Sequence, residues 1–259
     1  MSTRLSKTEL QEQVNKSIEE FSNYLNSLVS SDDINSNKRA SLISYWTTDY
    51  VKYLKKEKAF APPNYKYSRG DIVLVNFGYR VGCELGGLHF AIVIDNFNSK
   101  KSPIMTVVPL SSKKIDHNYN ETFSFELSKG VYELYMEKRE KLLNSAYENL
   151  NAITTIKEQL DKISNDEDFN NIDQSKIKEN IRKINEKIKK VKLLDRDLEN
   201  LKNGTIVAVS QITTISKLRI VNPKNSKDSL YDIKLDVVDL DKLNDYIKKL
   251  YIYKNQQIY

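Results

Sequence analysis

The sequence is poor in the residues that covalent crosslinks and metal sites require. Its one cysteine, Cys83, excludes an intramolecular disulfide and leaves no second thiol for a cysteine-based metal site. Its two histidines, His89 and His117, are too few to favour a zinc site without cysteine partners. We therefore expect no metal and no cofactor, and a reducing compartment such as the cytoplasm suits the chain.

Long apolar runs and common nucleotide-binding loops are missing as well. No run of about 18 apolar residues is long enough to cross a bilayer, and no segment resembles a signal peptide, so we expect a soluble protein of the cytoplasm. The sequence contains no Gly-x-x-x-x-Gly-Lys loop, dinucleotide fingerprint or Ser-His-Asp arrangement. Nucleotide hydrolysis and redox chemistry therefore have no support.

Charge of one sign is only slightly in excess. The 259 residues include 41 Lys and Arg against 35 Asp and Glu, a net charge of +6, and the isoelectric point is near 9.0. This balance leans toward a polyanionic partner, although mixed charge at 29% of the residues mostly forms solvated surface. The length allows one domain with additions, or two domains.

The few glycines are concentrated in one region. Five of the 7 glycines lie between Gly70 and Gly87, among three apolar, β-branched runs of strand length at 72–77, 88–94 and 105–110. Glycine is required where φ is positive or where another group closely approaches the backbone. The region therefore forms either tight corners of a sheet or a surface that faces a ligand.

Residues 1–64 are predicted to form a pair of helices. Apolar residues recur at spacings of three and four on both sides of an interruption at 30–33; they are Leu10, Val14, Ile18, Phe21, Leu25 and Leu28, and then Ile43, Trp46, Tyr50 and Leu54. A helical pair that packs on the main domain or on a partner is the simpler interpretation. The alternative is a basic and aromatic face for nucleic acid, formed by Tyr53, Lys55, Lys56 and Lys58.

In the second half of the chain, the spacing of apolar residues changes twice between strand-like and helical. Alternation at 122–127 predicts a half-buried strand, and helical spacing over 129–202 predicts an antiparallel helical hairpin. Strand patterns return at 204–220, and 237–253 predicts a closing helix. We therefore expect an α+β protein with the hairpin as an insertion. The hairpin's apolar seam and nearly balanced charge favour a rigid arm for oligomerisation or partner docking over an RNA-binding surface.

Several motifs occur together in the order and spacing of a known toxin family. The first block contains Arg69-Gly70-Asp71-Ile72-Val73, Val81-Gly82-Cys83-Glu84-Leu85-Gly86-Gly87-Leu88, Ala91-Ile92-Val93-Ile94-Asp95-Asn96, Ser102-Pro103 and Val108-Pro109-Leu110-Ser111-Ser112. A second block runs from Val209 to Arg219. With the last helix, these motifs resemble the PemK/MazF toxins over residues 66–128 and 203–253. The other helices lie outside the minimal form of that family.

The resemblance implies a small SH3-like β-barrel with a C-terminal helix, formed by residues 65–128 and 203–259, with 1–64 and 129–202 as added helical regions. It also implies the toxin of a type II toxin–antitoxin pair, usually a homodimer, that cuts single-stranded RNA at short sequences without a metal. In such cleavage the ribose 2′-oxygen attacks the adjacent phosphorus and leaves a 2′,3′-cyclic phosphate and a 5′-hydroxyl. RNA and an antitoxin protein are the expected partners, with no membrane.

One position departs from the family pattern. The family's catalytic arginine follows a glycine pair in Gly-Gly-x-Arg-Pro, and counting from Gly86 and Gly87 places His89 there, followed by Phe90. Arginine is permanently charged, whereas an unperturbed histidine, with a pKa of about 6.5, can exchange a proton at neutral pH. We predict that His89 acts as general base or acid, with the lost charge supplied by Arg80 or another cation. Without the resemblance, a lone histidine in an apolar strand is more often a core residue.

Ser111 falls at the family's second catalytic position. Its hydroxyl can donate to a phosphate oxygen or hold the nucleophile, and a turn residue at a strand end is the alternative interpretation. Some family members carry an acidic residue just before the glutamine of the second block, but Ser210 precedes Gln211 here. An Asp-dependent mechanism is therefore not expected, and more weight falls on His89.

The predicted substrate-binding residues are Arg80, Glu84, Gln211, Lys217 and Arg219. The three basic residues suit phosphate contacts and Glu84 suits a role in orienting a basic side chain, although surface charge is the alternative for each. His117, in a polar loop, is a weaker candidate for a second acid–base role.

Two classes of function remain open. The first is the ribonuclease toxin, and the second is a catalytically weak barrel that binds RNA or protein while its helices drive assembly; DNA binding is not expected. In an enzyme, His89 and Ser111 should face one another across an open groove.

Overall fold

The chain divides into two compact units. A computed structural model describes residues 5–62, 65–114, 118–161 and 174–252. The first unit, here the N-terminal unit, comprises residues 1–60 and 78–81, and the second, the sheet unit, comprises 61–77 and 82–259. The predicted hairpin therefore belongs to the same compact unit as the sheet. No helix within the described ranges is both long enough and apolar enough to span a membrane.

Two capped helices form the N-terminal unit. α1 (Lys7–Val29) begins with a capping box, in which Ser6 Oγ accepts from the Glu9 N–H at 3.3 Å and Glu9 accepts from the Ser6 N–H at 2.7 Å. α2 (Ile34–Glu57) begins at Asp33, whose carboxylate accepts from the backbone N–H groups of the first turn. The helical pair and its predicted interruption at 30–33 are confirmed.

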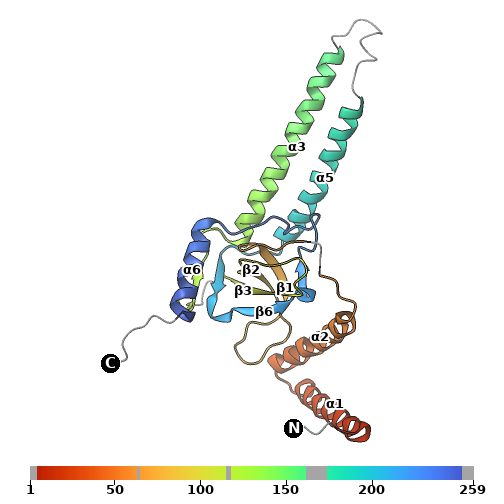
Figure 1. Cartoon of the computed structure of the whole chain (residues 1–259), viewed down its shortest axis with the longest axis vertical. Helices are drawn as coiled ribbons and strands as arrows, with labels where there is room; N and C mark the ends of the chain where they lie inside the picture. The colour runs from red at the N-terminus through yellow and green to blue at the C-terminus, as the bar shows by residue number, and fades with distance from the viewer. Residues whose placement is uncertain (1–4, 63–64, 115–117, 162–173, 253–259) are drawn as a thin grey trace, which may run out of the picture. The chain divides into compact units, whose positions relative to one another are not determined.

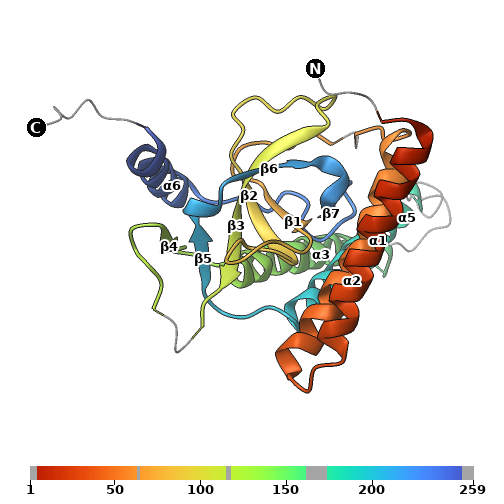
Figure 2. The same ribbon diagram turned by 90° about the horizontal axis from the view of Figure 1, so that it is seen from below.

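The sheet unit is built on one antiparallel sheet. Its strands are β1 (Ile72–Asn76), β2 (Leu88–Val93), β3 (Ile104–Ser112), β4 (Ser124–Glu126), β5 (Thr205–Ala208), β6 (Thr213–Ser216) and β7 (Ile220–Asn222). The spatial order is β4-β5-β3-β2-β1-β7, and β6 also pairs with β3. β-Branched residues dominate these runs, in agreement with the predicted strand segments. The strands after the hairpin thus pair with strands before it (Figures 1 and 2).

β3 changes partner along its length. Its first half pairs with β6 up to Val107, and its second half pairs with β5 from Leu110. The 3₁₀ turn η1 (Val209–Gln211) joins β5 to β6 opposite this change of partner. Pro109, which has no N–H to donate, lies in the gap between the two pairings, where that missing donor does least harm. β3, the last strand of the first sequence block, therefore pairs with the strand before η1 and with the strand after it.

The closed barrel implied by the resemblance is not confirmed. The sheet ends at β4 on one side and at β7 on the other, and these two strands do not pair with each other. The α+β class is confirmed, with an antiparallel sheet and helices α1, α2, α3 (Val131–Asp161), α5 (Gln174–Leu198) and α6 (Val237–Tyr251) in the described residues.

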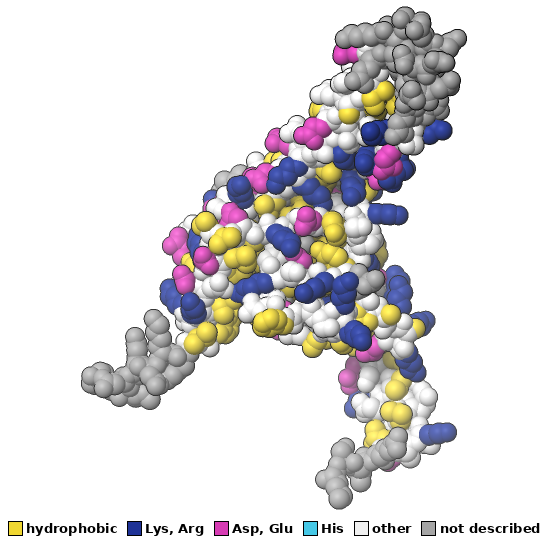
Figure 3. All heavy atoms as spheres, turned by 45° about the horizontal axis from the view of Figure 1, so that its top comes forward, with side chains coloured by type: hydrophobic (Ala, Val, Ile, Leu, Met, Phe, Trp, Pro, Cys, Tyr) yellow, Lys and Arg dark blue, Asp and Glu magenta, His cyan; other side chains and the backbone are white. Residues whose placement is uncertain are grey.

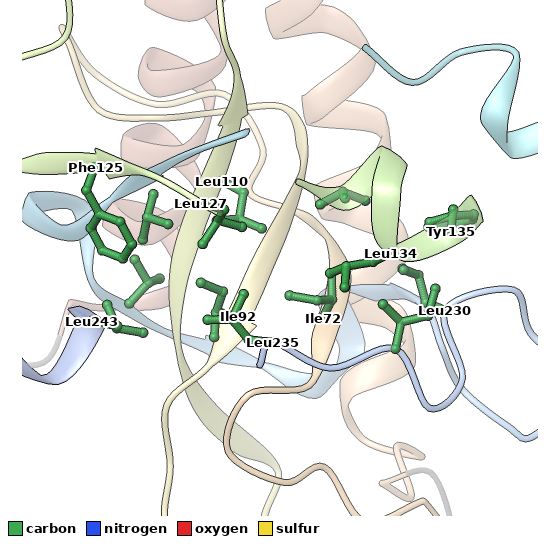
Figure 4. Packing of buried hydrophobic residues seen from close by; sticks show 14 of the residues in the cluster. Ile72, Ile92, Leu110, Phe125, Leu127, Leu134, Tyr135, Leu230, Leu235 and Leu243 are labelled. Atoms are coloured by element: carbon green, nitrogen blue, oxygen red, sulfur yellow. The ribbon is translucent and has the colours of Figure 1, made fainter. Parts of the chain in front are cut away.

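Each face of the sheet has its own apolar core. One cluster includes Val73, Val75, Ala91, Val107 and Ile215. The other contains Ile72, Ile92, Leu110 and Phe125 from the sheet, together with residues from α3, α5 and α6, and Figure 4 labels ten of its members. Because alternate residues of a strand point to opposite faces, strands buried on both faces read as continuous apolar runs.

α3 and α5 form the predicted antiparallel hairpin. The Arg139 side chain pairs with Asp195 near its base, and Lys187 Nζ donates to the carbonyl and hydroxyl oxygens of Ser145 at 2.9 and 2.6 Å. Figure 1 shows the two helices side by side. The turn predicted at 164–166 lies outside the described residues. The nearly balanced charge noted in the sequence holds for the hairpin as a whole but not for each helix. Lys and Arg are concentrated on α5, whereas acidic residues predominate on α3 (Figure 3).

A partly buried lysine links α3 to the segment before α6. Lys138 lines a pocket of about 300 Å³, and its ammonium donates to Ser229 O at 2.8 Å and to Tyr231 O. Burial lowers the pKa of Lys138 to about 8, with a further lowering from the nearby Lys190. The ordinary value of 10.5 applies to the unfolded chain. Between these values, the unfolded state therefore holds a proton that the native state releases.

This difference predicts a pH-dependent stability. Relative to Lys138→Met, the wild-type chain should gain free energy of unfolding as the pH rises from about 8 to 10.5, because the unfolded state binds more protons there. Urea unfolding of both proteins at pH 7.5 and pH 10 measures the change, with Lys141→Met, an exposed position of the same helix, as the matched control. Parallel pH profiles for wild type and Lys138→Met would refute the prediction.

Candidate functional site

His89 lies at the margin of the sheet's core. It is the second residue of β2, where burial falls from complete at Ala91–Val93 to exposure at Leu88, and it is itself half-buried opposite Val75 of β1. Its Nδ1 lies 3.1 Å from the carbonyl oxygen of Leu110 on β3. The histidine is therefore held by a neighbouring strand and still partly open to solvent.

The contact with Leu110 fixes the tautomer of the imidazole. A carbonyl oxygen can only accept a hydrogen bond, so Nδ1 must carry the proton that lies between the two atoms. In the neutral ring the other nitrogen, Nε2, then has a free lone pair and can accept a proton. This arrangement suits a histidine that acts as a general base. The carbonyl oxygen of Leu110 accepts the Nδ1 hydrogen bond that a carboxylate accepts in many catalytic sites.

Ser111 follows Leu110 on the same strand. The pairing of β2 with β3 ends at Ala91 and Pro109, and a continuation of this register by two residues would set His89 opposite Ser111. Directly opposed residues of an antiparallel pair point to the same face of the sheet. Ser111 is half-buried, next to the exposed strand end at Ser112. The facing arrangement of the two predicted catalytic residues therefore stays a prediction.

Gln211 anchors the glycine-containing loop that precedes His89. Its side-chain amide donates to Cys83 O at 3.3 Å, and its Oε1 accepts from the Leu85 N–H at 3.3 Å. The loop ends at Gly87, which has a φ of +87° and whose carbonyl accepts from the Phe77 N–H at 2.7 Å. A role in substrate binding was predicted for Gln211, and the structure gives it two contacts within the protein. It joins the second sequence block to the first.

Loss of these two hydrogen bonds should loosen the loop. In Gln211→Leu, we expect amide hydrogen exchange at residues 83–86 to accelerate about five-fold, the equivalent of about 1 kcal/mol for the lost bonds. Hydrogen exchange followed by mass spectrometry measures this directly. Ser210→Ala, an exposed neighbour in the same turn, serves as the control. Equal exchange in Gln211→Leu and wild type would show that the loop is held by other contacts.

Two basic residues at the end of the second block, both predicted to bind substrate, make contacts within the fold. Lys217 is buried, with 2% of its surface exposed, and its ammonium donates to Ser99 O at 2.8 Å. Burial lowers the pKa of Lys217. Arg219 donates to the carbonyl oxygens of Asn76, at 3.0 Å, and Phe77 at the end of β1. The burial of Lys217 opposes direct contact with RNA, and we do not retain it in the site.

The remaining candidates stay predictions. Glu84 is exposed in the 82–87 loop. Arg80 falls in the segment 78–81, which belongs to the N-terminal unit. His117 lies outside the described residues. The cation expected to replace the family's arginine is therefore not identified among these side chains.

Comparison with known proteins agrees with the sequence motifs and the geometry. Residues 68–191 match the family model described as PemK-like, MazF-like toxin of type II toxin–antitoxin system. This segment of the chain resembles the PemK/MazF toxins. No curated protein matches the chain significantly. The family match begins just before β1 and continues through α3 to Val191 of α5, so it does not extend over the second block at 209–219.

The matched family is described as the toxin of a type II toxin–antitoxin system, a class that implies an antitoxin as partner. Within the described part of the chain, no group of three or more His, Cys, Asp and Glu side chains is arranged to hold a metal ion.

The candidate site includes one group that sequence reasoning did not identify. The carbonyl of Leu110 orients His89, yet backbone oxygens have no signature in a sequence. The signal that could have found it is the strand pairing, since aligning the apolar runs of β2 and β3 brings residues 89 and 110–111 together.

Proposed function

We propose that this chain is a toxin of the PemK/MazF type, a metal-independent endoribonuclease that cuts single-stranded RNA with His89 as the general base. The observation that carries the proposal is the hydrogen bond from His89 Nδ1–H to Leu110 O, which leaves Nε2 as the proton acceptor. A nucleophilic 2′-hydroxyl requires such an acceptor, and RNA supplies its own nucleophile. A bound metal is not needed for this reaction.

In the proposed reaction, Nε2 of His89 takes the proton of the 2′-hydroxyl as the 2′-oxygen bonds to phosphorus. The bond from phosphorus to the 5′-oxygen breaks, and this oxygen leaves with a proton from the imidazolium or from water. The products are a 2′,3′-cyclic phosphate and a 5′-hydroxyl. Nδ1–H remains bonded to Leu110 O throughout, so the ring keeps its orientation.

Two further groups support this assignment. The Ser111 hydroxyl, opposite His89 if the register of β2 and β3 continues, can donate to a non-bridging phosphate oxygen as negative charge develops there. The imidazolium formed in the first step is itself a cation beside the phosphate. It supplies part of the positive charge that arginine provides in the family. Gln211 holds the 82–87 loop and thus acts as a positioning residue.

The finer family properties are part of the same proposal. The strands β1, β2, β3, β6 and β7 correspond to the SH3-like barrel, and the toxin forms a homodimer. The antitoxin covers the surface around His89 and Ser111 and blocks access of RNA. A sequence-selective cut requires pockets for unstacked bases.

Incubation of purified, antitoxin-free protein with varied single-stranded RNAs in EDTA tests the proposal. Fragments with 2′,3′-cyclic phosphate and 5′-hydroxyl ends are the expected result, and addition of Mg²⁺ should leave the rate unchanged. Products with 5′-phosphate ends, or a strict requirement for Mg²⁺, would contradict the mechanism. RNA binding without cleavage would favour the catalytically weak binding module, for which the loss of the family's arginine is the supporting observation.

A further inference from the structure

The first helix presents an apolar stripe that the second helix of the same unit leaves largely uncovered. Leu10, Val14, Ile18 and Phe21 of α1 are 52%, 42%, 63% and 40% exposed, and no residue of α1 is buried. At 100° per residue these side chains, with Leu25 and Leu28, occupy one narrow face of the helix. An amphipathic helix gains most of its stability by burying such a face. A contiguous exposed stripe therefore indicates a surface that another helix covers.

The uncovered part of the stripe lies in the first half of α1. Leu25 and Leu28, at the other end, are half-buried. At that end α1 packs on α2, where the Arg39 guanidinium lies 5.8 Å from the centre of the Tyr24 ring. The capping box at Ser6 and Glu9 fixes the start of the helix. Residues 10–21 thus form about three turns of capped helix with a free apolar face.

The spacing of the stripe makes it complementary to itself. Residues 10, 14, 18 and 21 lie nearly symmetrically about a point between Val14 and Ile18. If two copies of α1 lie antiparallel, Leu10 of one faces Phe21 of the other, and Val14 faces Ile18. Every layer of the seam then pairs two apolar side chains, with the larger pairs at its two ends and the smaller pairs at its centre.

The charge pattern also favours an identical partner. The positions that flank the stripe carry no charge; they are Gln11, Gln13, Asn15, Ser17, Ser22 and Tyr24. The charged residues between 9 and 20 lie on the opposite half of the helix; they are Glu9, Glu12, Lys16, Glu19 and Glu20. Flanking charges are what select a different partner helix and exclude self-pairing, and they are missing here. The acidic back of the helix is also unlike the basic polar face of helices that lie on anionic membranes.

We propose that α1 pairs antiparallel with α1 of a second copy of this chain through Leu10, Val14, Ile18 and Phe21. This interface is distinct from any dimer formed by the sheet units, so the proposal does not rest on the ribonuclease activity. If the sheet units also dimerise, the α1 seam joins dimers into larger assemblies. The seam then determines how many toxin copies are held together.

The first test is the mass of the full-length protein in solution. Sedimentation equilibrium compares wild type with V14E/I18E, which places two charges in the seam, and with K16Q/N23D, which makes the same charge change on the opposite face. We expect the seam variant to lose one association step, with its mass halved relative to both other proteins. Far-UV circular dichroism must show equal helix content in all three. Equal masses for the seam variant and the control would overturn the proposal.

The second test fixes the orientation of the pair. In a Cys83→Ser background, Val14→Cys and Ile18→Cys chains are oxidised separately and as a mixture. An antiparallel seam predicts that the mixed disulfide forms at least about ten-fold faster than either self-disulfide, since the pairing sets 14 against 18. Preferred self-disulfides would indicate a parallel pair and reject the proposed seam. A monomeric wild-type chain whose stripe is needed only to bind phosphatidylglycerol vesicles, or only to bind antitoxin, would also overturn it.

Discussion

His89→Ala should lower the rate of RNA cleavage at saturating RNA by at least about 100-fold, the usual contribution of a positioned general base. The substitution removes Nε2, the acceptor for the 2′-hydroxyl proton in the proposed reaction. Binding of RNA should change only a few-fold, because histidine acts on the reacting atoms and holds little of the substrate. Single-turnover cleavage in EDTA, together with a filter-binding assay, measures both quantities.

Controls separate this chemistry from a structural effect. The bond to Leu110 contributes about 1 kcal/mol, so His89→Ala should remain folded. Ile104→Ala, at the far and half-exposed end of β3, should retain wild-type cleavage. Ser111→Ala should lose about ten-fold, because one hydrogen-bond donor to the phosphate is removed. Full cleavage by a folded His89→Ala protein would exclude His89 as the base. Ser111 and Arg80 would then be the next residues to test for a catalytic role.

The elements of this fold were largely predictable because their signals are local. The interruption at 30–33 carries Asp33, whose side chain caps the following helix, and the apolar periods of α1, α3, α5 and α6 span many turns. The strands of the sheet were equally clear as β-branched runs. What the periodicity could not supply is closure of the sheet, because that depends on whether distant edge strands meet.

Charged and amide side chains were harder to assign for a physical reason. Lys217 and Arg219 look like surface cations in the sequence, yet their donors satisfy carbonyl oxygens of Ser99 and of the end of β1, more than 100 residues earlier. Gln211 likewise satisfies backbone groups of a distant loop. A buried backbone group must find a partner, and a long polar side chain from anywhere in the chain can provide it.

The position of His89 was predictable and its chemical state was not. Counting from the glycine pair gives the residue, since the spacing of a loop and a strand is preserved in the sequence. The proton on Nδ1 depends on the carbonyl of Leu110, which only the pairing of β2 with β3 brings near. The candidate site therefore depends on the register of β3 against β2. A shift of that register would remove the hydrogen bond that orients His89, even with the sequence unchanged.

Asp239→Ala should destabilise the sheet unit by about 3 kcal/mol. Asp239 is 2% exposed in the first turn of α6, and its carboxylate accepts from the Ser128 N–H at 3.0 Å and the Ser128 hydroxyl at 2.7 Å. These bonds hold α6 to the segment after β4. The substitution removes two charge-assisted hydrogen bonds and a negative charge at a helix N-terminus, and leaves the Ser128 N–H without its partner.

Urea unfolding followed by far-UV circular dichroism measures the loss, because the only tryptophan, Trp46, belongs to the N-terminal unit and does not report on α6. With an m value of about 2 kcal/mol/M, the midpoint should fall by about 1.5 M. Asp241→Ala, an exposed aspartate of the same helix, should shift it little, and Asp239→Asn, which keeps one acceptor, should fall between the two. If Asp239→Ala and Asp241→Ala unfold at the same midpoint, α6 is held by its apolar face through Leu243, and the buried carboxylate contributes no net stability.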